Sequence, residues 1–207
     1  MTVVKVANTD EERQRIFQFR YSIYIEQQGK SYEADHKNRL LFDAADDDSA
    51  ALLYTTDKNG NVVSTMRINW GYKHFIECDF MKLSFFQHCF SDDDVMFCSR
   101  LMTLPNYKTH VLKLFLEGYR MARKRGVIAC FSHCDTKLIP FFKKLGFLTY
   151  GQSYYIEGVG EQQSLLLLDD KEHFAKISSP LLKISEEFES DKWKRLSDLK
   201  QISRILN

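Results

Sequence analysis

The chain has 207 residues, of which 44% are hydrophobic, so it can bury the core of one α/β domain, and global disorder is excluded. Two full domains would be cramped at this length. The formal net charge of +1 argues against a dedicated nucleic-acid-binding protein, which normally carries a strong basic excess.

The first part of the chain predicts a helix, a polar loop and a hairpin. Residues 10–28 carry apolar side chains at helical spacing, Asn8, Thr9 or Asp10 can cap this helix, and Gly29 ends it. Residues 30–48 are polar and too numerous for a simple connection, which favours a binding loop. Residues 50–56 and 62–69 flank an Asn-Gly pair, the strongest short signal for a β-hairpin.

The second part alternates strands and helices. A short helix is expected near residues 81–88, and a buried strand at 95–104 is ended by Pro105. A long amphipathic helix at 108–125 and a Gly126 break precede a strand at 127–131. A helix at 136–145 with a Gly146 stop, strands at 147–157 and 162–168, and a polar helical tail at 170–207, split near Pro180, complete the chain.

This order predicts an α/β fold with a mixed sheet and helices on both of its faces. We expect residues 1–169 to form one domain and residues 170–207 to be its helical C-terminal extension. The N-terminus shows no basic region followed by an apolar run, and no apolar stretch reaches the ~18 residues that span a bilayer. The five irregularly spaced cysteines fit a reducing compartment, so we expect a cytoplasmic protein.

Several short motifs, in order, carry a family resemblance over residues 10–168. Phe141-Phe-Lys-Lys-Leu-Gly-Phe resembles the recurrent turn of the Gcn5-related N-acyltransferase (GNAT) superfamily. Phe19-Arg-Tyr-Ser-Ile-Tyr-Ile-Glu, Asp43-Ala-Ala-Asp, Met66-Arg-Ile and Ser99-Arg-Leu resemble its autoinducer-synthase branch. That branch contains acyl-homoserine-lactone synthases and long-chain N-acyl amino acid synthases. The resemblance implies the GNAT fold, a twisted mixed sheet flanked by helices.

The resemblance also implies an acceptor site. The positions at which the branch keeps polar residues around its acceptor pocket are Arg20, Asp43, Asp46, Arg67 and Arg100. Asp43 and Asp46 would bind and align the acceptor amine, and Arg67 or Arg100 its carboxylate. Arg20 would organise the acceptor loop by pairing with Asp43 or Asp46, and the alternative is a surface ion pair. For Asp43 and Asp46 the alternative is a solvated acidic loop, and for the two strand arginines a structural ion pair across the sheet.

Two departures from the family pattern bear on mechanism. Phe97 and Cys98 stand where homoserine-lactone synthases usually carry an acidic residue, which weakens a prediction of S-adenosylmethionine recognition. Phe141 and Phe142 replace the tyrosine that often serves ordinary acetyltransferases as general acid. Glu77 and Glu26 are candidate bases.

The acyl donor is expected at the strand ending at Pro105, which in this family separates from its neighbour to admit a pantetheine arm. The strand backbone would hold the thioester carbonyl, and the first residues of the next helix would meet a phosphate. These donor-binding candidates are Leu101, Met102, Thr103, Leu104, Lys108 and Thr109. No glycine lies in residues 104–110, so close approach of the backbone to the pyrophosphate of coenzyme A would be hindered. This favours the phosphopantetheine of an acyl carrier protein as donor.

Basic residues on and after the long helix are candidates for docking an acidic carrier protein. They are Lys113, Arg120, Arg123, Lys124 and Lys143, and the alternative is a solvated helix face. Cys130, His133 and Cys134 lack a second ligand pair, so we expect no metal. The many aromatic residues line an acyl tunnel or form ordinary core.

The leading prediction is an N-acyltransferase that moves a fatty acyl group from a phosphopantetheine thioester to the amine of an amino acid, a small metabolite or a peptide side chain. It needs no permanently bound cofactor, and acyl carrier protein or acyl-coenzyme A is its co-substrate. The alternatives are a coenzyme A-dependent short-chain acetyltransferase and a non-catalytic acyl-binding domain.

Overall fold

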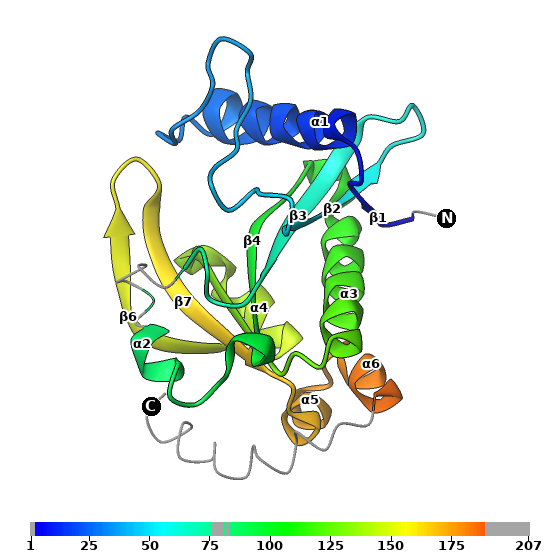
Figure 1. The fold of residues 1–207 in the computed structure, drawn as a ribbon, viewed down its shortest axis with the longest axis vertical. Coiled ribbons are helices and arrows are strands. Elements are labelled where there is room, and N and C mark those ends of the chain that lie inside the picture. The colour runs from blue at the N-terminus through cyan, green and yellow to red at the C-terminus, as the bar shows by residue number, and fades with distance from the viewer. Residues whose placement is uncertain (1–2, 76–80, 82, 189–207) are drawn as a thin grey trace. The chain divides into compact units, whose positions relative to one another are not determined.

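The computed structural model describes residues 3–75, 81 and 83–188 and contains one mixed sheet of seven strands in the order β1-β2-β3-β4-β5-β7-β6 (Figure 1). Pairing is parallel between β4 and β5 and antiparallel for β1–β2, β2–β3 and β5–β7. The strands are β1 Lys5–Val6, β2 Ala51–Thr56, β3 Val62–Trp70, β4 Val95–Thr103, β5 Ala129–Asp135, β6 Leu148–Ile156 and β7 Gly160–Leu168. The predicted mixed sheet is confirmed.

The helices are α1 Asp10–Tyr21, α2 Leu83–Phe86, α3 Lys108–Lys124, α4 Ile139–Leu145, α5 Lys171–Ile177 and α6 Leu182–Glu187. A π-helical turn, η1 Ser22–Gln27, extends α1, and single 3₁₀ turns lie at η3 Asp92–Asp94, η4 Pro105–Tyr107 and η5 Thr136–Leu138. By its contacts the chain divides into two compact units. The first comprises residues 1–69, 98–118 and 156–160, and the second the remaining residues.

The predicted helix at 10–28 forms as two segments. Thr9 caps α1 by accepting a hydrogen bond from the Glu12 amide, as the N-cap pattern predicts. The last turns are π-helical, because the Gln28 amide donates to the Ile23 carbonyl five residues earlier. The helix ends at Gly29, whose positive φ of 63° suits glycine.

The predicted hairpin is confirmed as β2 and β3. Its turn is closed by the Asp57 amide, which donates to the Asn61 carbonyl at 2.9 Å, and Gly60 takes a φ of 85°. Apolar side chains of β2, β3 and α1 form the core of the first unit, which contains Ala7, Ile16, Phe17, Phe19, Ile23, Ala50, Leu52, Tyr54, Val62 and Met102.

The second unit has an aromatic core. Phe131 lies at its centre, with Phe97, Phe86, Phe90, Tyr72 and Tyr150 within 6.5 Å between ring centroids. Asp169, just beyond β7, accepts hydrogen bonds from Tyr119 on α3 and from Ser185 on α6, and forms an ion pair with Arg123. Helix α6 is therefore tied to a buried carboxylate. The predicted helical tail is confirmed on either side of Pro180 by α5 and α6, and its residues 189–207 lie outside the described residues.

The bounds of β5 and α4 differ from the sequence prediction, and one strand was missed. Strand β5 begins at Ala129 instead of 127 and continues to Asp135, because its pairing with β7 extends that far. The helix predicted at 136–145 starts with a 3₁₀ turn, and only Ile139–Leu145 is α-helical before the predicted stop at Gly146, φ 114°. The two-residue strand β1 is too short to carry a period-two signal and was not predicted.

The pairing of β4 with β5 bears on donor binding. Their registered pairs in the described chain are Val95–Ala129, Met96–Cys130 and Phe97–Phe131, although β4 continues to Thr103 and β5 to Asp135. The registered ladder ends at Phe97, and the separation of the strands beyond it stays a prediction.

Candidate functional site

Five charged residues predicted for the acceptor site come together in the first unit and are called here the Arg–Asp cluster. Arg20 lies near the end of α1, Asp43 and Asp46 in the polar loop, Arg67 on β3 and Arg100 on β4. Arg20 Nη1 contacts Asp46 Oδ1 at 2.7 Å, and Arg67 Nη1 contacts Asp43 Oδ1 at 2.5 Å and Asp46 Oδ2 at 3.0 Å. Arg100 Nη2 contacts Asp43 Oδ2 at 2.6 Å. One network thus joins all five side chains.

The polar loop is shaped by its own carboxylates. The Asp43 amide donates to Asp46 Oδ2 at 3.1 Å, and the Ala45 amide donates to Asp43 Oδ1 at 2.9 Å. Asn69 Nδ2 donates to the Ala45 carbonyl at 2.6 Å, and Arg13 donates to the Asp46 carbonyl. These bonds hold both carboxylates toward the arginines, and a solvated acidic loop is excluded for Asp46, which is 8% exposed.

Exposure divides the cluster into an inner and an outer part. The side chains of Arg20, Asp46 and Arg67 are 0%, 1% and 4% exposed. Those of Arg100 and Asp43 are 16% and 35% exposed. The surface ion pair considered for Arg20 is therefore wrong, because its pair with Asp46 is buried. A ligand from solvent meets Asp43 and Arg100 first.

The cluster carries three guanidinium groups and two carboxylates, a formal excess of one positive charge. Burial alone would raise the pKa of Asp43, but the charges and hydrogen bonds of Arg67 and Arg100 hold it well below its usual range. Asp43 is therefore ionised at neutral pH. Burial lowers the pKa of Arg20, against the opposing charge of Asp46. Arg20 Nε and Nη2 have no hydrogen-bond partner among the described residues, which leaves donors for a further oxygen.

Sequence reasoning assigned no role to three residues that contact this cluster. Ser99 Oγ accepts a hydrogen bond from Arg67 Nε at 3.0 Å. The rings of Tyr32 and Tyr24 lie 4.6 Å and 5.9 Å from the Arg100 guanidinium carbon. Ser99 belongs to the Ser99-Arg-Leu motif and Tyr24 to the motif that begins at Phe19, so both had a signal, whereas Tyr32, in the polar loop, had none.

The donor-binding candidates lie at the end of β4 and the start of α3. The Leu104 amide donates to the Val63 carbonyl at 2.9 Å, and the Met102 carbonyl accepts from Ser64 Oγ at 3.0 Å. Leu104 therefore has no free N–H for a thioester carbonyl, which corrects its predicted role. Because amides alternate along a strand, the Thr103 N–H points away from β3. Lys108 and Thr109 are exposed at the start of α3.

The five predicted docking residues have different surroundings. Lys124 and Lys143 are exposed, whereas Lys113 and Arg120 are half-buried. Arg123 is buried, and its Nη1 lies 2.7 Å from Asp169 Oδ2. The expectation that Arg123 meets a carrier protein is wrong, because this guanidinium completes a buried ion pair.

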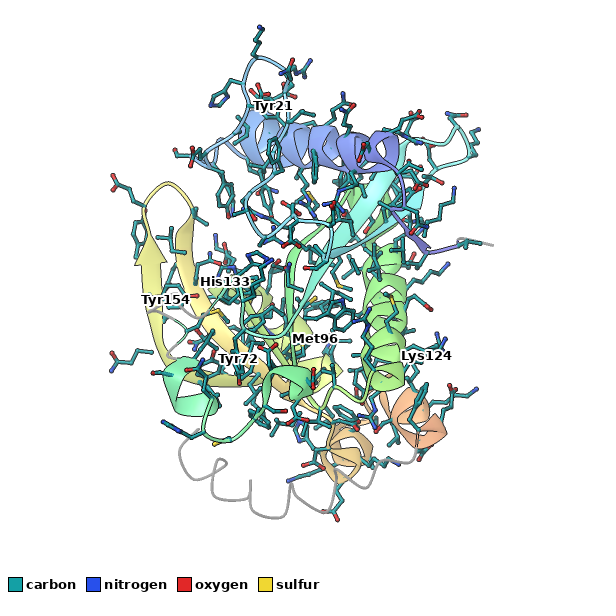
Figure 2. All side chains as sticks on the ribbon, viewed as in Figure 1. Tyr21, Tyr72, Met96, Lys124, His133 and Tyr154 are labelled. Atoms are coloured by element: carbon teal, nitrogen blue, oxygen red, sulfur yellow. The ribbon has the colours of Figure 1, made fainter. Side chains whose placement is uncertain are left out.

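The remaining described candidates, Glu26 and His133, have partners outside the Arg–Asp cluster. Glu77 falls outside the described residues. Glu26, considered as a base, is paired with Arg39 at 2.5 Å at the surface. His133 Nδ1 lies 3.2 Å from the Tyr154 hydroxyl (Figure 2). Within residues 3–75, 81 and 83–188, no group of three histidine, cysteine or acidic side chains is arranged to hold a metal. Over the same ranges, no helix has the length and apolar character to cross a membrane.

A sequence model of the family described as "N-acyl amino acid synthase FeeM" matches residues 15–169. No curated protein matches the chain in sequence.

Solved structures share the fold at low sequence identity. FeeM, an N-acyl amino acid synthase from uncultured soil microbes, has a TM-score of 0.68 at 15% identity, over 88% of this chain and 97% of that chain. BjaI, a coenzyme A-dependent acyl-homoserine lactone synthase with bound MTA, has a TM-score of 0.68 at 15% identity, over 87% and 91%. TofI, in a ternary complex with an inhibitor and MTA, has a TM-score of 0.65 at 16% identity, over 89% and 99%. These likenesses confirm the predicted GNAT-like fold.

Proposed function

Because the chain belongs to the N-acyl amino acid synthase FeeM family, we propose that the Arg–Asp cluster binds its acceptor amino acid. The chain is an N-acyltransferase that forms an amide between an acyl group and the amine of an amino acid. This family membership favours the leading sequence prediction over a non-catalytic acyl-binding domain.

The observation that carries the acceptor proposal is the half-buried Asp43–Arg100 pair at the outer edge of a cluster with excess positive charge. An amino acid presents an ammonium group and a carboxylate one carbon apart, so adjacent opposite charges complement it. Its carboxylate would contact Arg100 and its amine Asp43. The excess positive charge of the cluster favours binding of the carboxylate.

The chemistry requires a neutral amine that attacks the thioester carbonyl. A C–N bond forms, the C–S bond breaks, the nitrogen loses a proton and the departing thiolate gains one. Asp43 orients the amine and is a poor proton acceptor, because its pKa is strongly lowered. Glu77 keeps the role of proposed proton acceptor. By the alternation along β4, the N–H groups of Leu101 and Thr103 are the proposed donors to the carbonyl oxygen, and that of Met102 faces β3 as that of Leu104 does.

We further propose acyl carrier protein as the donor and Lys124 and Lys143 as part of its docking face. The absence of glycine in residues 104–110 supports this, because a pyrophosphate needs close approach to backbone amides. The exposed lysines support it through charge complementarity with an acidic carrier. Acyl-coenzyme A is the competing donor.

We also propose that residues 1–169 are the acyltransferase domain and residues 170–207 an extension of the same domain. The family match ends at residue 169, and Phe174, Leu181 and Ile184 beyond it are buried.

The test is a product analysis. The protein is incubated with the twenty amino acids and either long-chain acyl carrier protein or the matching acyl-coenzyme A, and N-acyl amino acids are measured by mass spectrometry. We expect products with the carrier-protein donor, and loss of product in Asp43→Asn and Arg100→Gln. Arg39→Gln is the matched control, since Arg39 is an ion-paired arginine with a positive φ of 56° but lies outside the cluster.

Equal turnover with acyl-coenzyme A would contradict the carrier-protein proposal alone. Full activity of folded Asp43→Asn and Arg100→Gln proteins would contradict the acceptor site.

A further inference from the structure

Arg100 has an unusual backbone for a residue within a strand. Its φ is 52°, in the left-handed region that residues with a side chain rarely occupy, although it lies inside β4. Such a conformation persists only where surrounding contacts hold it. The side-chain contacts of Arg100 are therefore candidates for holding this backbone conformation.

The ion pair with Asp43 does not by itself fix the guanidinium. Asp43 is shared: its Oδ1 contacts Arg67 at 2.5 Å and its Oδ2 contacts Arg100 at 2.6 Å. The contact with Asp43 through Nη2 alone leaves the guanidinium plane free to turn about that bond, and Tyr32, whose side chain also hydrogen-bonds Arg100, is a further partner. A second set of contacts must define the plane.

Two tyrosine rings supply that second set. The Arg100 guanidinium carbon lies 4.6 Å from the Tyr32 ring centroid and 5.9 Å from that of Tyr24, within the range of cation–π attraction. The two rings contact each other edge to face, with centroids 5.2 Å apart and planes at 61°. The guanidinium is therefore held by two rings on one side and by a carboxylate at its end.

The chain places these rings by local features. Tyr24 lies in the π-helical turn η1, and its carbonyl accepts from the Lys30 amide at 2.9 Å. Tyr32 follows Ser31, whose amide donates to the Gly158 carbonyl at 3.2 Å. A Cβ on Gly158 would lie 2.6 Å from Ser31 Cβ, so only glycine allows this approach. The β6–β7 turn thus supports the ring that packs on Arg100.

We propose that Tyr24 and Tyr32 are positioning residues that orient the Arg100 guanidinium toward the carboxylate of the acceptor. This inference rests on the proposed acceptor site. Burial raises the pKa of Tyr32 to about 12 and also raises that of Tyr24, so both hydroxyls stay protonated at neutral pH and neither tyrosine acts as a base.

The first test separates ring from hydroxyl. Tyr32→Leu removes the π face, and we expect the acceptor KM to rise about 3- to 30-fold with kcat and the donor KM nearly unchanged. Tyr32→Phe keeps the face, and its acceptor KM should stay within about 2-fold of wild type. Tyr155→Leu is the matched control, since Tyr155 is 75% exposed on β6. Equal effects of Leu and Phe, or a loss confined to kcat, would overturn the inference.

A second variant acts without changing the rings. Gly158→Ala should displace Ser31 and raise the acceptor KM as Tyr32→Leu does. Gly151→Ala is its control, because Gly151 has a similar φ of 64° but nothing within 4 Å of the added Cβ. Equal acceptor KM values for the two alanine variants would count against the role of the Ser31 contact in placing Tyr32.

A ligand-free measurement distinguishes failure of this inference from failure of the proposed function. In a double-mutant cycle of Tyr32→Leu and Arg100→Gln, the Tm loss of the double variant should be smaller than the sum of the losses of the two single variants, because each change removes the same contact. Additive losses would refute the Tyr32–Arg100 contact whatever the protein acylates. If the two losses are coupled but Tyr32→Leu leaves the acceptor KM unchanged, the contact exists but has no role in acceptor binding, and the inference is overturned.

Discussion

Replacement of Asp169 by alanine should strongly destabilise the second unit. The Asp169 side chain is 1% exposed and accepts from Arg123 Nη1 at 2.7 Å, from Ser185 Oγ at 2.6 Å and from the Tyr119 hydroxyl. The substitution leaves the Arg123 guanidinium, itself 1% exposed, as an uncompensated buried charge.

The size of the effect follows from that burial. Removing one partner of a buried ion pair costs about 3–5 kcal/mol. In a chain of this length each kcal/mol lowers the Tm by about 2–4 °C, so Asp169→Ala should lower it by about 6–20 °C. Ser185→Ala removes one hydrogen bond to the carboxylate and should cost about 1.5–3 kcal/mol.

Thermal unfolding followed by circular dichroism measures both variants. The control is Glu26→Ala, which breaks the pair with Arg39 whose side chains are 38% and 65% exposed, and should cost no more than about 1 kcal/mol. If Asp169→Ala unfolds within about 4 °C of the wild type, the argument from the buried charge is refuted. A neutral Ser185→Ala would show that α6 does not depend on this carboxylate.

Further predictions concern the reaction. Asp43→Asn should lower kcat/KM for the acceptor about 10- to 150-fold and leave the donor KM unchanged, since a charged hydrogen bond is worth about 1.5–3 kcal/mol; a matching change in donor KM would count against an acceptor role. Because the pKa of Asp43 is lowered on folding, its contribution to stability is present above about pH 4 and is lost as pH falls through the folded pKa. The stability difference between wild type and Asp43→Asn should therefore be constant from pH 5 to 8 and shrink in acid, and a change near neutrality would contradict this assignment. Lys124→Glu and Lys143→Glu should raise KM for acyl carrier protein, more at low salt, but not KM for acyl-coenzyme A; Lys58→Glu, in the exposed β2–β3 turn, is the control, and equal effects from all three would indicate only the change in net charge.

The local pattern of the chain was enough to predict most elements. The Asn59-Gly60 pair predicted the turn between β2 and β3, and the Thr9 cap predicted the start of α1, because both effects act within four residues. Helix α3 was predicted from its apolar face. The extent of β5 did not, since it is set by pairing with β7 some thirty residues away.

The residues of the acceptor site were identified by motif resemblance, and their roles were not. Sequence left open whether Arg20, Arg67 and Arg100 form surface pairs, structural pairs or a ligand site. Only the folded chain brings Asp43 and Asp46 onto all three arginines and leaves Asp43 and Arg100 at the exposed edge.

Arg123 and Tyr32 show most directly what could not be predicted from the sequence. On the sequence Arg123 looks like its basic neighbours on α3, and its buried partner Asp169 lies beyond three further strands and a helix. Tyr32 sits in a polar loop with no periodicity, yet its ring lies against a guanidinium from β4. The sequence determines short-range geometry because a cap or a turn depends on the dihedral angles of only a few neighbouring residues. The burial and pairing of a charge depend on long-range contacts that exist only after folding.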